Sequence, residues 1–515
     1  MNGRLFYSAL LVFCLHAGAA ELELMGATYL GGAGADEAAA VDIAPDRTIV
    51  YAGVMAGALD GQAETSFLGG GNGILIRFNS SGTQVLSVAR FPDRIDDMEI
   101  DRAGGNIATI GAFGTVVLSA DASAAIWSAD ALGTGSGGST LGPGRRVSIG
   151  ARGTVAALFG KSFAVYDNSG TELGTGSMPH GHVNDVAVHD EHRRVFIAGF
   201  DQRNTCGNPV QVAVVKAFDF DGTEVWKRFG FEATSANFCG DYGNQMADTR
   251  GMLVTVGRDG DLYFAGESAG GNSIFRYNGE DLATATLIHY DAFTHAYNTS
   301  SNHITYYARM DPSTGTVKMG QLVLPRLSSG KGNTIRPTAL GADEDGNVYV
   351  AGTTTFHIDS TGLPTIDGGD VAHAGGFVLI SRSDFMARLL WTTFEKEAYS
   401  STAYGVACGK GLSAVASTVT KDRMYTANAL QASGGPASED NPDGYLAVWE
   451  GHTPAATRFE QRCPVPGRRP GSNAAFELYD LRGRRANVWH HPAGVFCAKT
   501  SQGRTRLLPL HLAAF

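Results

Sequence analysis

A strand–turn–strand unit recurs along this chain and limits the folds that it can adopt. The clearest copy is residues 340–354 (LGADEDGNVYVAGTT), where valines alternate with small or polar residues and Asp345-Gly346-Asn347 supplies the turn. Six weaker copies bring the total to seven; they lie at residues 41–54, 98–113, 147–160, 186–200, 253–267 and 405–419.

A second hairpin follows most of these copies. Residues 212–218, for example, lead through Asp219-Phe220-Asp221-Gly222 to residues 224–231. Each unit therefore contains four strands, and four-stranded units repeated around an axis are typical of a β-propeller. We predict an all-β, seven-bladed propeller; an open sandwich or two separate β domains is the alternative.

The two ends of the repeat region predict how the ring closes. The last strand, residues 445–450 (YLAVWE), corresponds to the third strand of a blade that lacks a fourth. The first strand, residues 21–30, corresponds to a fourth strand with no blade before it. We expect this N-terminal strand to pair with the last blade, because pairing removes two exposed strand edges.

Charge and hydropathy restrict the compartment and the partners. The formal net charge of -11 and the absence of a basic face argue against nucleic-acid binding. Residues 1–20 have the pattern of a secretory signal peptide: Arg4, an apolar run, then Gly18-Ala19-Ala20. No later segment has the length and apolarity of a transmembrane helix, so we expect a protein that is secreted or displayed on the outer cell surface.

The five cysteines that follow the signal contain no CxxC pair, which excludes zinc-ribbon and thioredoxin-like motifs. An exported protein can form disulfides, and the candidate pairs are Cys206 with Cys239 and Cys463 with Cys497. Cys408 lies within a strand copy, and we expect it to be a buried small hydrophobic residue.

The first and sixth copies carry a recognisable family pattern. Tyr29-Leu30-Gly31-Gly32-Ala33-Gly34-Ala35-Asp36-Glu37, followed by Val41-Asp42 and Val50-Tyr51-Ala52-Gly53, resembles the bacterial β-propeller repeat abbreviated SBBP. Residues 343–353 (DEDGNVYVAGT) resemble the second half of the same repeat. The resemblance covers most of residues 21–452 and implies the propeller fold and export; it implies no catalytic residues.

A separate C-terminal unit follows the propeller. Residues 453–472, which contain Pro464, Pro466 and Pro470, read as a linker. In residues 473–515, the stretches 476–484 (FELYDLRGR) and 492–496 (PAGVF) resemble the C-terminal sorting domain of type IX secretion. This resemblance implies a small β-sandwich that the export machinery recognises.

The longest insertions all fall in connections that emerge on one face of a propeller. They are residues 55–73, 201–209, 232–249, 268–303 and 355–375. Loops on a rigid scaffold commonly hold binding sites. The insertion at 268–303 supplies the candidate ligand-binding residues, which are His289, Tyr290, Asp291, Phe293, His295, Tyr297 and His303.

These features favour a monomeric binding scaffold for an extracellular polysaccharide or a surface protein. The alternative is a glycan-active hydrolase or lyase with acidic residues at the central tunnel. We expect no cofactor and no metal, because the acidic turns lack a calcium-loop pattern and no catalytic motif is present. Two carboxylates close together at one tunnel mouth would favour the enzyme.

Overall fold

The computed structural model divides the chain into two units, residues 1–453 and 454–515, which are considered separately below. The structure describes residues 22–450 with internal gaps, and three stretches beyond them at 477–479, 496–499 and 505–508. The gaps are residues 33, 60, 133–138, 140, 143, 180, 206–207, 232–246, 272, 278, 281, 283–302, 330, 359–362, 365, 367–373, 395–400, 421–424 and 434–440.

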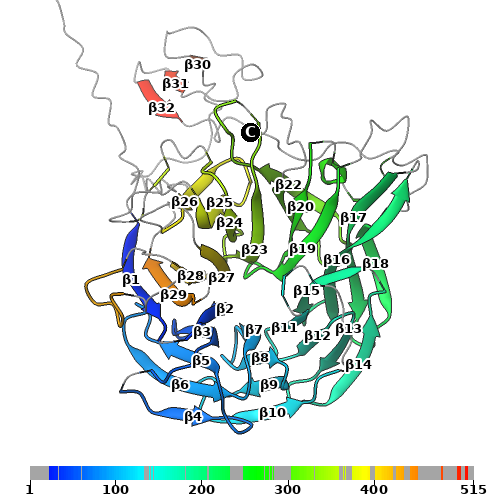
Figure 1. Ribbon diagram of the computed structural model, residues 1–515. Helices are drawn as coiled ribbons and strands as arrows, with labels where there is room; N and C mark the ends of the chain where they lie inside the picture. The colour runs from blue at the N-terminus through cyan, green and yellow to red at the C-terminus, as the bar shows by residue number, and fades with distance from the viewer. Residues whose placement is uncertain are drawn as a thin grey trace, which may run out of the picture. The chain divides into compact units, whose positions relative to one another are not determined.

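The first unit is an all-β propeller of seven blades. Figure 1 shows the seven sheets around a centre, with β2, β7, β11, β15, β19, β23 and β27 innermost. The first three blades comprise β2 (Glu37–Ile43), β3 (Ile49–Val54), β5 (Gly73–Phe78) and β6 (Val85–Phe91); β7 (Ile95–Ile100), β8 (Ile107–Gly111), β9 (Gly114–Leu118) and β10 (Ala125–Ala129); and β11 (Arg145–Ile149), β12 (Val155–Phe159), β13 (Ser162–Tyr166) and β14 (Glu172–Ser177).

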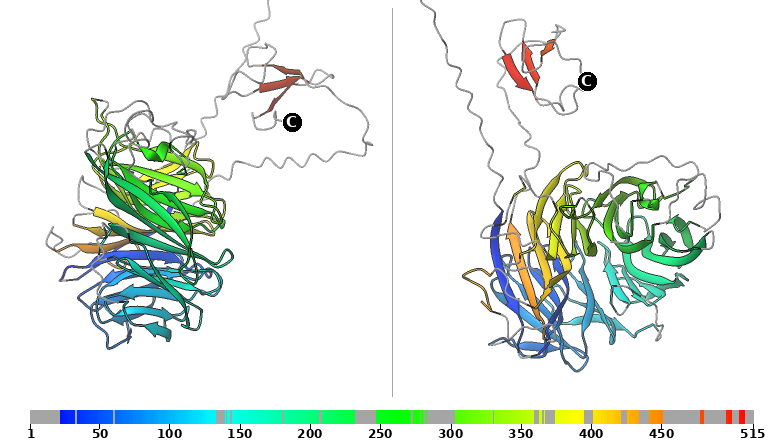
Figure 2. Two further views of the ribbon diagram at one scale, coloured as in Figure 1. Left: turned by 90° about the vertical axis from the view of Figure 1, so that its right-hand side faces the viewer. Right: turned by 45° about the horizontal axis from the view of Figure 1, so that its top comes forward.

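The remaining blades repeat this antiparallel order. They comprise β15 (His182–His189), β16 (Arg194–Thr205), β17 (Asn208–Asp219) and β18 (Glu224–Phe229); β19 (Thr249–Val256), β20 (Leu262–Ser268), β21 (Ile304–Met310) and β22 (Val317–Val323); β23 (Ile335–Ala342), β24 (Val348–Thr354), β25 (Gly375–Ser381) and β26 (Arg388–Thr392); and β27 (Ser401–Gly409), β28 (Leu412–Val419), β29 (Asp443–Glu450) and β1 (Glu23–Leu30). Figure 2 shows the strands running between the two faces of the ring.

Each of the seven predicted strand–turn–strand copies forms the first and second strands of one blade, so the repeat count was right. Two details differ from the prediction. Residues 201–209 were expected to form a loop insertion, but they lengthen the β16–β17 hairpin, whose pairing continues to Thr205 opposite Asn208. The loop after β3 adds a short strand, β4 (Glu64–Ser66), which pairs in parallel with β6.

The N-terminal strand closes the ring as predicted. β1 pairs antiparallel with β29, with Tyr29 opposite Tyr445, and completes blade 7. The outer edge of β1 is covered by the β28–β29 connection, where Gln431 accepts a hydrogen bond from the Tyr29 amide (3.2 Å) and Thr426 donates one to the Ala27 carbonyl (3.1 Å). Both edges of β1 are thereby paired, which prevents association through an open strand.

The hydrophobic core lies between adjacent blades. One cluster joins Tyr263 of blade 5 to Phe377 and Trp391 of blade 6, and another joins blade 1 to blade 7. Trp391 and Trp449 are each only 1% exposed. Because every sheet buries both faces against its neighbours, its inner strands are apolar at nearly every position that does not face the central channel.

The second unit has three described strands, β30 (Glu477–Tyr479), β31 (Phe496–Lys499) and β32 (Thr505–Leu508), paired antiparallel in that order. Most of the residues on which the sorting-domain resemblance depends, 480–484 and 492–495 among them, lie outside the described residues.

Candidate functional site

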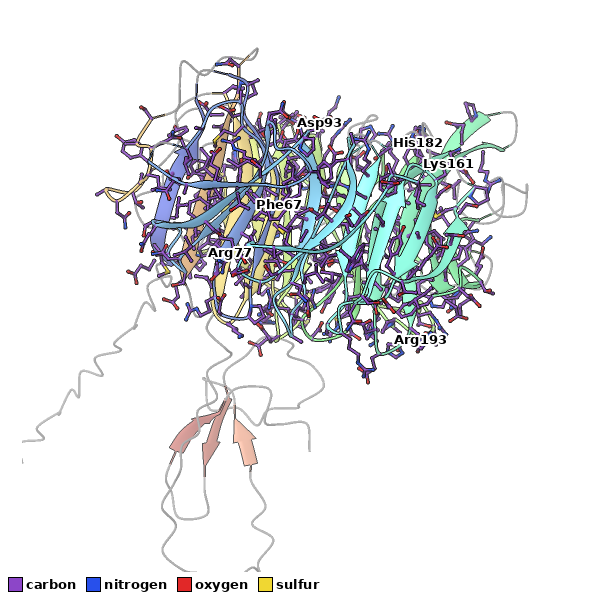
Figure 3. The ribbon with its side chains drawn as sticks, turned by 90° about the horizontal axis from the view of Figure 1, so that it is seen from below. Phe67, Arg77, Asp93, Lys161, His182 and Arg193 are labelled. Carbon is purple, nitrogen blue, oxygen red and sulfur yellow. The ribbon has the colours of Figure 1, made fainter. Side chains whose placement is uncertain are left out.

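One face of the propeller carries the long connections, and we call it the loop face. All seven inner strands begin there, and the turns between the first and second strands of each blade lie on the opposite, hairpin face. Figure 3 shows Asp93, Lys161 and His182 along the loop face and Arg193 on the hairpin face. Four predicted insertions belong to the loop face, namely residues 55–73, 232–249, 268–303 and 355–375. Sequence analysis missed a further one between β28 and β29.

Six of the seven inner strands contain a β-bulge one to three residues after the strand begins at the loop face. A bulge inserts one extra residue and redirects its side chain, and bulges are common beside functional sites. The strand β11 has a regular register with β12. The extra residues of the other six strands are Ala39, Asp96, Asn184, Met252, Thr338 and Tyr404.

A glycine on the second strand lies opposite the bulge in five of these blades. A Cβ atom at Gly352 would lie less than 3.0 Å from the carbonyl oxygen of Arg336, which is too close for any real Cβ contact. The equivalent glycines are Gly53, Gly111, Gly199 and Gly266. The glycine of the repeat pattern therefore serves the bulge, and the bulge places a side chain at the mouth of the channel.

The bulge residues surround a cavity of about 420 Å³ at the loop face, which we call the mouth pocket. Five of the six line it, Asn184 being the exception, and its walls come from six of the seven blades. Its volume lies in the range typical of small-ligand sites, roughly 300–1,000 Å³.

Among the described residues that line the mouth pocket, arginines outnumber carboxylates by five to three. The arginines are Arg94, Arg145, Arg146, Arg250 and Arg336, and the carboxylates are Glu37, Asp96 and Glu267. The pocket thus carries an excess of positive charge in a protein whose formal net charge is -11.

Ion pairs hold the arginines in place. Asp96 accepts a hydrogen bond from Arg145 (2.7 Å), and burial raises the pKa of the Asp96 carboxyl. Glu267 lies 3.4 Å from Arg250, 3.1 Å from Nδ1 of His303 and 3.8 Å from Arg336. The two carboxylate side chains are only 3% and 2% exposed, so they lie beneath the guanidinium groups.

The channel continues below the mouth pocket as a smaller cavity of about 130 Å³, lined by all seven inner strands. Arg146, Thr338 and Tyr404 line both cavities, so they mark the boundary between them.

The carboxylates of this lower cavity join neighbouring blades. Each accepts a hydrogen bond from a backbone amide of the next inner strand. Asp42 accepts from Ile100 (2.9 Å), Asp97 from Val147 (3.0 Å), Glu99 from Ile149 (3.0 Å) and Asp185 from Val254 (2.9 Å). Burial raises the pKa of Glu99 and of Asp185 to about 7. Arg102 faces Glu99 and Arg146 faces Asp185, and each arginine opposes this rise.

Two arginines cross the channel at the hairpin face. Arg102 of blade 2 donates to the carbonyls of Val256 (2.5 Å) and Gly257 (2.7 Å) of blade 5. Arg258 of blade 5 donates to the carbonyl of Ile43 of blade 1 (2.8 Å) and lies 3.7 Å from Asp42. These side chains span blades on opposite sides of the ring, so they obstruct the channel at this end.

Most candidate ligand residues from the sequence, His289 to Tyr297, lie outside the described residues. His303 is described, and it lies against Glu267 beside the mouth pocket. Cys206, Cys239 and Cys463 also fall outside, and only the backbone of Cys497 is described, in β31. Cys408 is buried, as expected.

Sequence analysis missed the arginines and the bulge residues of the mouth pocket. The repeat nevertheless contained a signal for the bulge residues. In each of these five blades, the second-strand glycine pairs with the residue immediately before the bulge residue, so the position of the glycine locates the bulge.

Within the described part of the chain, no group of three His, Cys, Asp or Glu side chains has the arrangement of a metal site. The same residues include no helix of the length and apolarity that a membrane crossing needs.

The fold and channel define a seven-bladed β-propeller, and a match to a family model agrees with this class. Residues 326–359 match the family model described as a beta-propeller repeat, SBBP. The matched residues include the β23–β24 hairpin and Gly352. No curated protein matches the chain. Among solved structures, the chain is similar to Kuenenia stuttgartiensis hydrazine synthase at 9% identity and a TM-score of 0.43, covering 78% of this chain and 98% of that one.

Proposed function

We propose that this protein is a binding scaffold that holds an extracellular polysaccharide or a surface protein in the mouth pocket. The observation that carries the proposal is the convergence of five bulge residues and five arginines on one cavity of about 420 Å³. Rigid strands supply these side chains, so the pocket is preorganised for binding.

The channel carboxylates give little support to the alternative of a glycan-active enzyme. Asp97 and Asp185 lie near each other, and the charge of Asp97 contributes to the raised pKa of Asp185. A catalytic pair must reach a substrate, but both carboxylates accept hydrogen bonds from strand amides. Their geometry suits cohesion between blades better than proton transfer.

Export and surface display belong to the same proposal. The signal-like residues 1–20 and the sorting-domain resemblance within residues 473–515 support them. Processing of the C-terminal unit by the export machinery would release the propeller or leave it attached outside the cell.

Glycan and peptide arrays probed with the full chain test this function. Thr402 lines the mouth pocket and is half-buried, so Thr402→Trp should fill the cavity while leaving the channel carboxylates in place. We expect binding to at least one array member and its loss in T402W, with an unchanged melting temperature. An absence of binding, or binding that T402W leaves intact, would overturn the proposal. Release of reducing ends from a bound glycan would favour the enzyme.

A further inference from the structure

We propose that the mouth pocket recognises a uronate, the carboxylate-bearing sugar unit of an acidic polysaccharide. This inference rests on the proposed binding function and specifies the ligand class. It draws on three features of the pocket: the sign of the exposed charge, an accessible aromatic ring and the obstruction of the channel.

The charge that faces the solvent in the mouth pocket is predominantly positive, and Glu37 is the one exposed carboxylate among the described residues that line it. The side chains of Arg94, Arg145 and Arg336 are 31%, 30% and 44% exposed, whereas those of Asp96 and Glu267 are almost completely buried. The buried carboxylates pair with the guanidinium groups, and each guanidinium has five N–H donors, so it retains donors beyond its ion pair. A guanidinium group binds a carboxylate through two parallel hydrogen bonds, which makes an anionic ligand group the best match.

Tyr404 favours a sugar over other anionic ligands. It is the only aromatic bulge residue, and it is 36% exposed at the base of the mouth pocket. An aromatic ring presents a flat apolar surface on which the C–H face of a sugar can stack. Thr353 and Thr402 line the same cavity and are half-buried, and their hydroxyls can both donate to and accept from sugar hydroxyls.

Glu37 adds an acceptor for those hydroxyls. Its side chain is 36% exposed and pairs with Arg94. The Glu37 carboxylate can accept a hydrogen bond from one sugar hydroxyl, and the neighbouring Arg94 guanidinium can donate a hydrogen bond to the next hydroxyl. A polyglutamate peptide would use the arginines but would offer no flat C–H face to the ring of Tyr404.

The obstructed channel restricts how a polysaccharide can enter. The mouth pocket of about 420 Å³ adjoins a lower cavity of only about 130 Å³ at Tyr404, and Arg102 and Arg258 cross the hairpin end. A chain cannot thread through the ring. We therefore infer that the pocket takes a terminal or branching uronate unit.

Calorimetric titration of the full chain with three probes tests the inference. The probes are tetragalacturonate, its neutral methyl ester and a hexaglutamate peptide. We expect tetragalacturonate to bind at least about tenfold more tightly than either of the others, and we expect free galacturonate to compete with it. Its affinity should fall as salt increases, because charged contacts at an open mouth are screened.

Arg336 is the most suitable residue to substitute, because it is the most exposed of the pocket arginines that form ion pairs with the buried carboxylates. We expect Arg336→Ala to weaken binding of tetragalacturonate about tenfold and Arg336→Lys to weaken it less. Tyr404→Ala should weaken the binding of both the acid and its ester. The matched control is Arg152→Ala, since Arg152 is an exposed arginine in the β11–β12 turn on the hairpin face.

Each contrary result has a definite meaning. Equal affinity for the acid and the ester, tighter binding of the peptide, or equal effects of R336A and R152A would overturn the uronate inference. The same holds if none of the three probes binds. The array experiment separates these failures from failure of the binding function, because neutral glycans and proteins can still bind there in a T402W-sensitive manner.

Discussion

Substitution of Gly352 by alanine tests whether the repeat glycine exists to accommodate the bulge. The backbone of Gly352 lacks a positive φ, so alanine introduces no dihedral strain. It does place a methyl group less than 3.0 Å from the Arg336 carbonyl oxygen and close to the Pro337 Cα. Both obstructing atoms belong to the backbone, so β23 and β24 must separate to relieve the overlap.

The expected cost is about 3 kcal/mol, at the upper end of the usual range for overpacking because no side-chain rotation relieves the clash. Alanine offsets roughly 0.4–1 kcal/mol of this by reducing the entropy of the unfolded chain. At roughly 2 cal/mol/K of unfolding entropy per residue, a propeller of this size should lose about 2–3 °C in melting temperature.

Differential scanning calorimetry of Gly352→Ala beside Gly57→Ala provides the measurement. A Cβ at Gly57 would meet nothing within 4 Å, and its φ is not positive, so this variant should melt at or slightly above the wild-type temperature. Blade 7 has Ser417 opposite its bulge, which shows that a Cβ can be accommodated where the strands are arranged around it. If G352A melts together with G57A, the strands relax at little cost and the steric account of the glycine is wrong.

Four further substitutions follow from the same contacts. Ser417→Ala should stabilise the protein by about 1 kcal/mol in urea unfolding, because the buried Ser417 hydroxyl has no hydrogen-bond partner; a destabilised variant would contradict this. Asp185 has a folded pKa of about 7, above its unfolded value of 3.8, so its protonation stabilises the fold; stability from this group is lost as pH rises from about 4 to 7, and Asp185→Asn should melt higher than the wild type at pH 8, with a difference that shrinks as pH falls toward 4. Arg258→Ala should cost about 3 kcal/mol and expose the thiol of Cys408 to maleimide, located by peptide mapping; an unlabelled thiol would show that the channel stays closed. Tyr29→Ala should cost about 3–5 kcal/mol and promote aggregation, seen by light scattering, whereas an unchanged melt would refute ring closure through β1.

The blade count and the closure were predictable because both depend on local pattern. Alternating apolar residues and Asp-Gly turns specify hairpins, and the unpaired strands at the two ends specify each other as partners. The length of the β16–β17 hairpin was not predictable in this way. Its extension contains Pro209, Asn204 and Asn208, residues that favour turns, and pairing with the partner strand overrides that preference.

The mouth pocket was harder to predict from the sequence, because its residues come from six different blades. Arg94, Arg145, Arg250 and Arg336 lie within the first three residues of an inner strand or immediately before it. Their spacing along the chain follows the irregular lengths of the insertions, so no sequence window contains two blades' contributions. Only alignment of the seven copies by their bulges would have placed them in one ring.

The bulge also explains why a repeated fold can hold a specific site. Positions that pack between blades must be apolar, and the position opposite the bulge favours glycine, so the fold determines them. The extra residue of the bulge has no partner residue on the second strand, and the six blades carry alanine, aspartate, asparagine, methionine, threonine and tyrosine there. Exchanging Tyr404 for other side chains should therefore change what the pocket binds more than it changes stability. In this architecture, ligand specificity is set at the positions that the sheet constrains least.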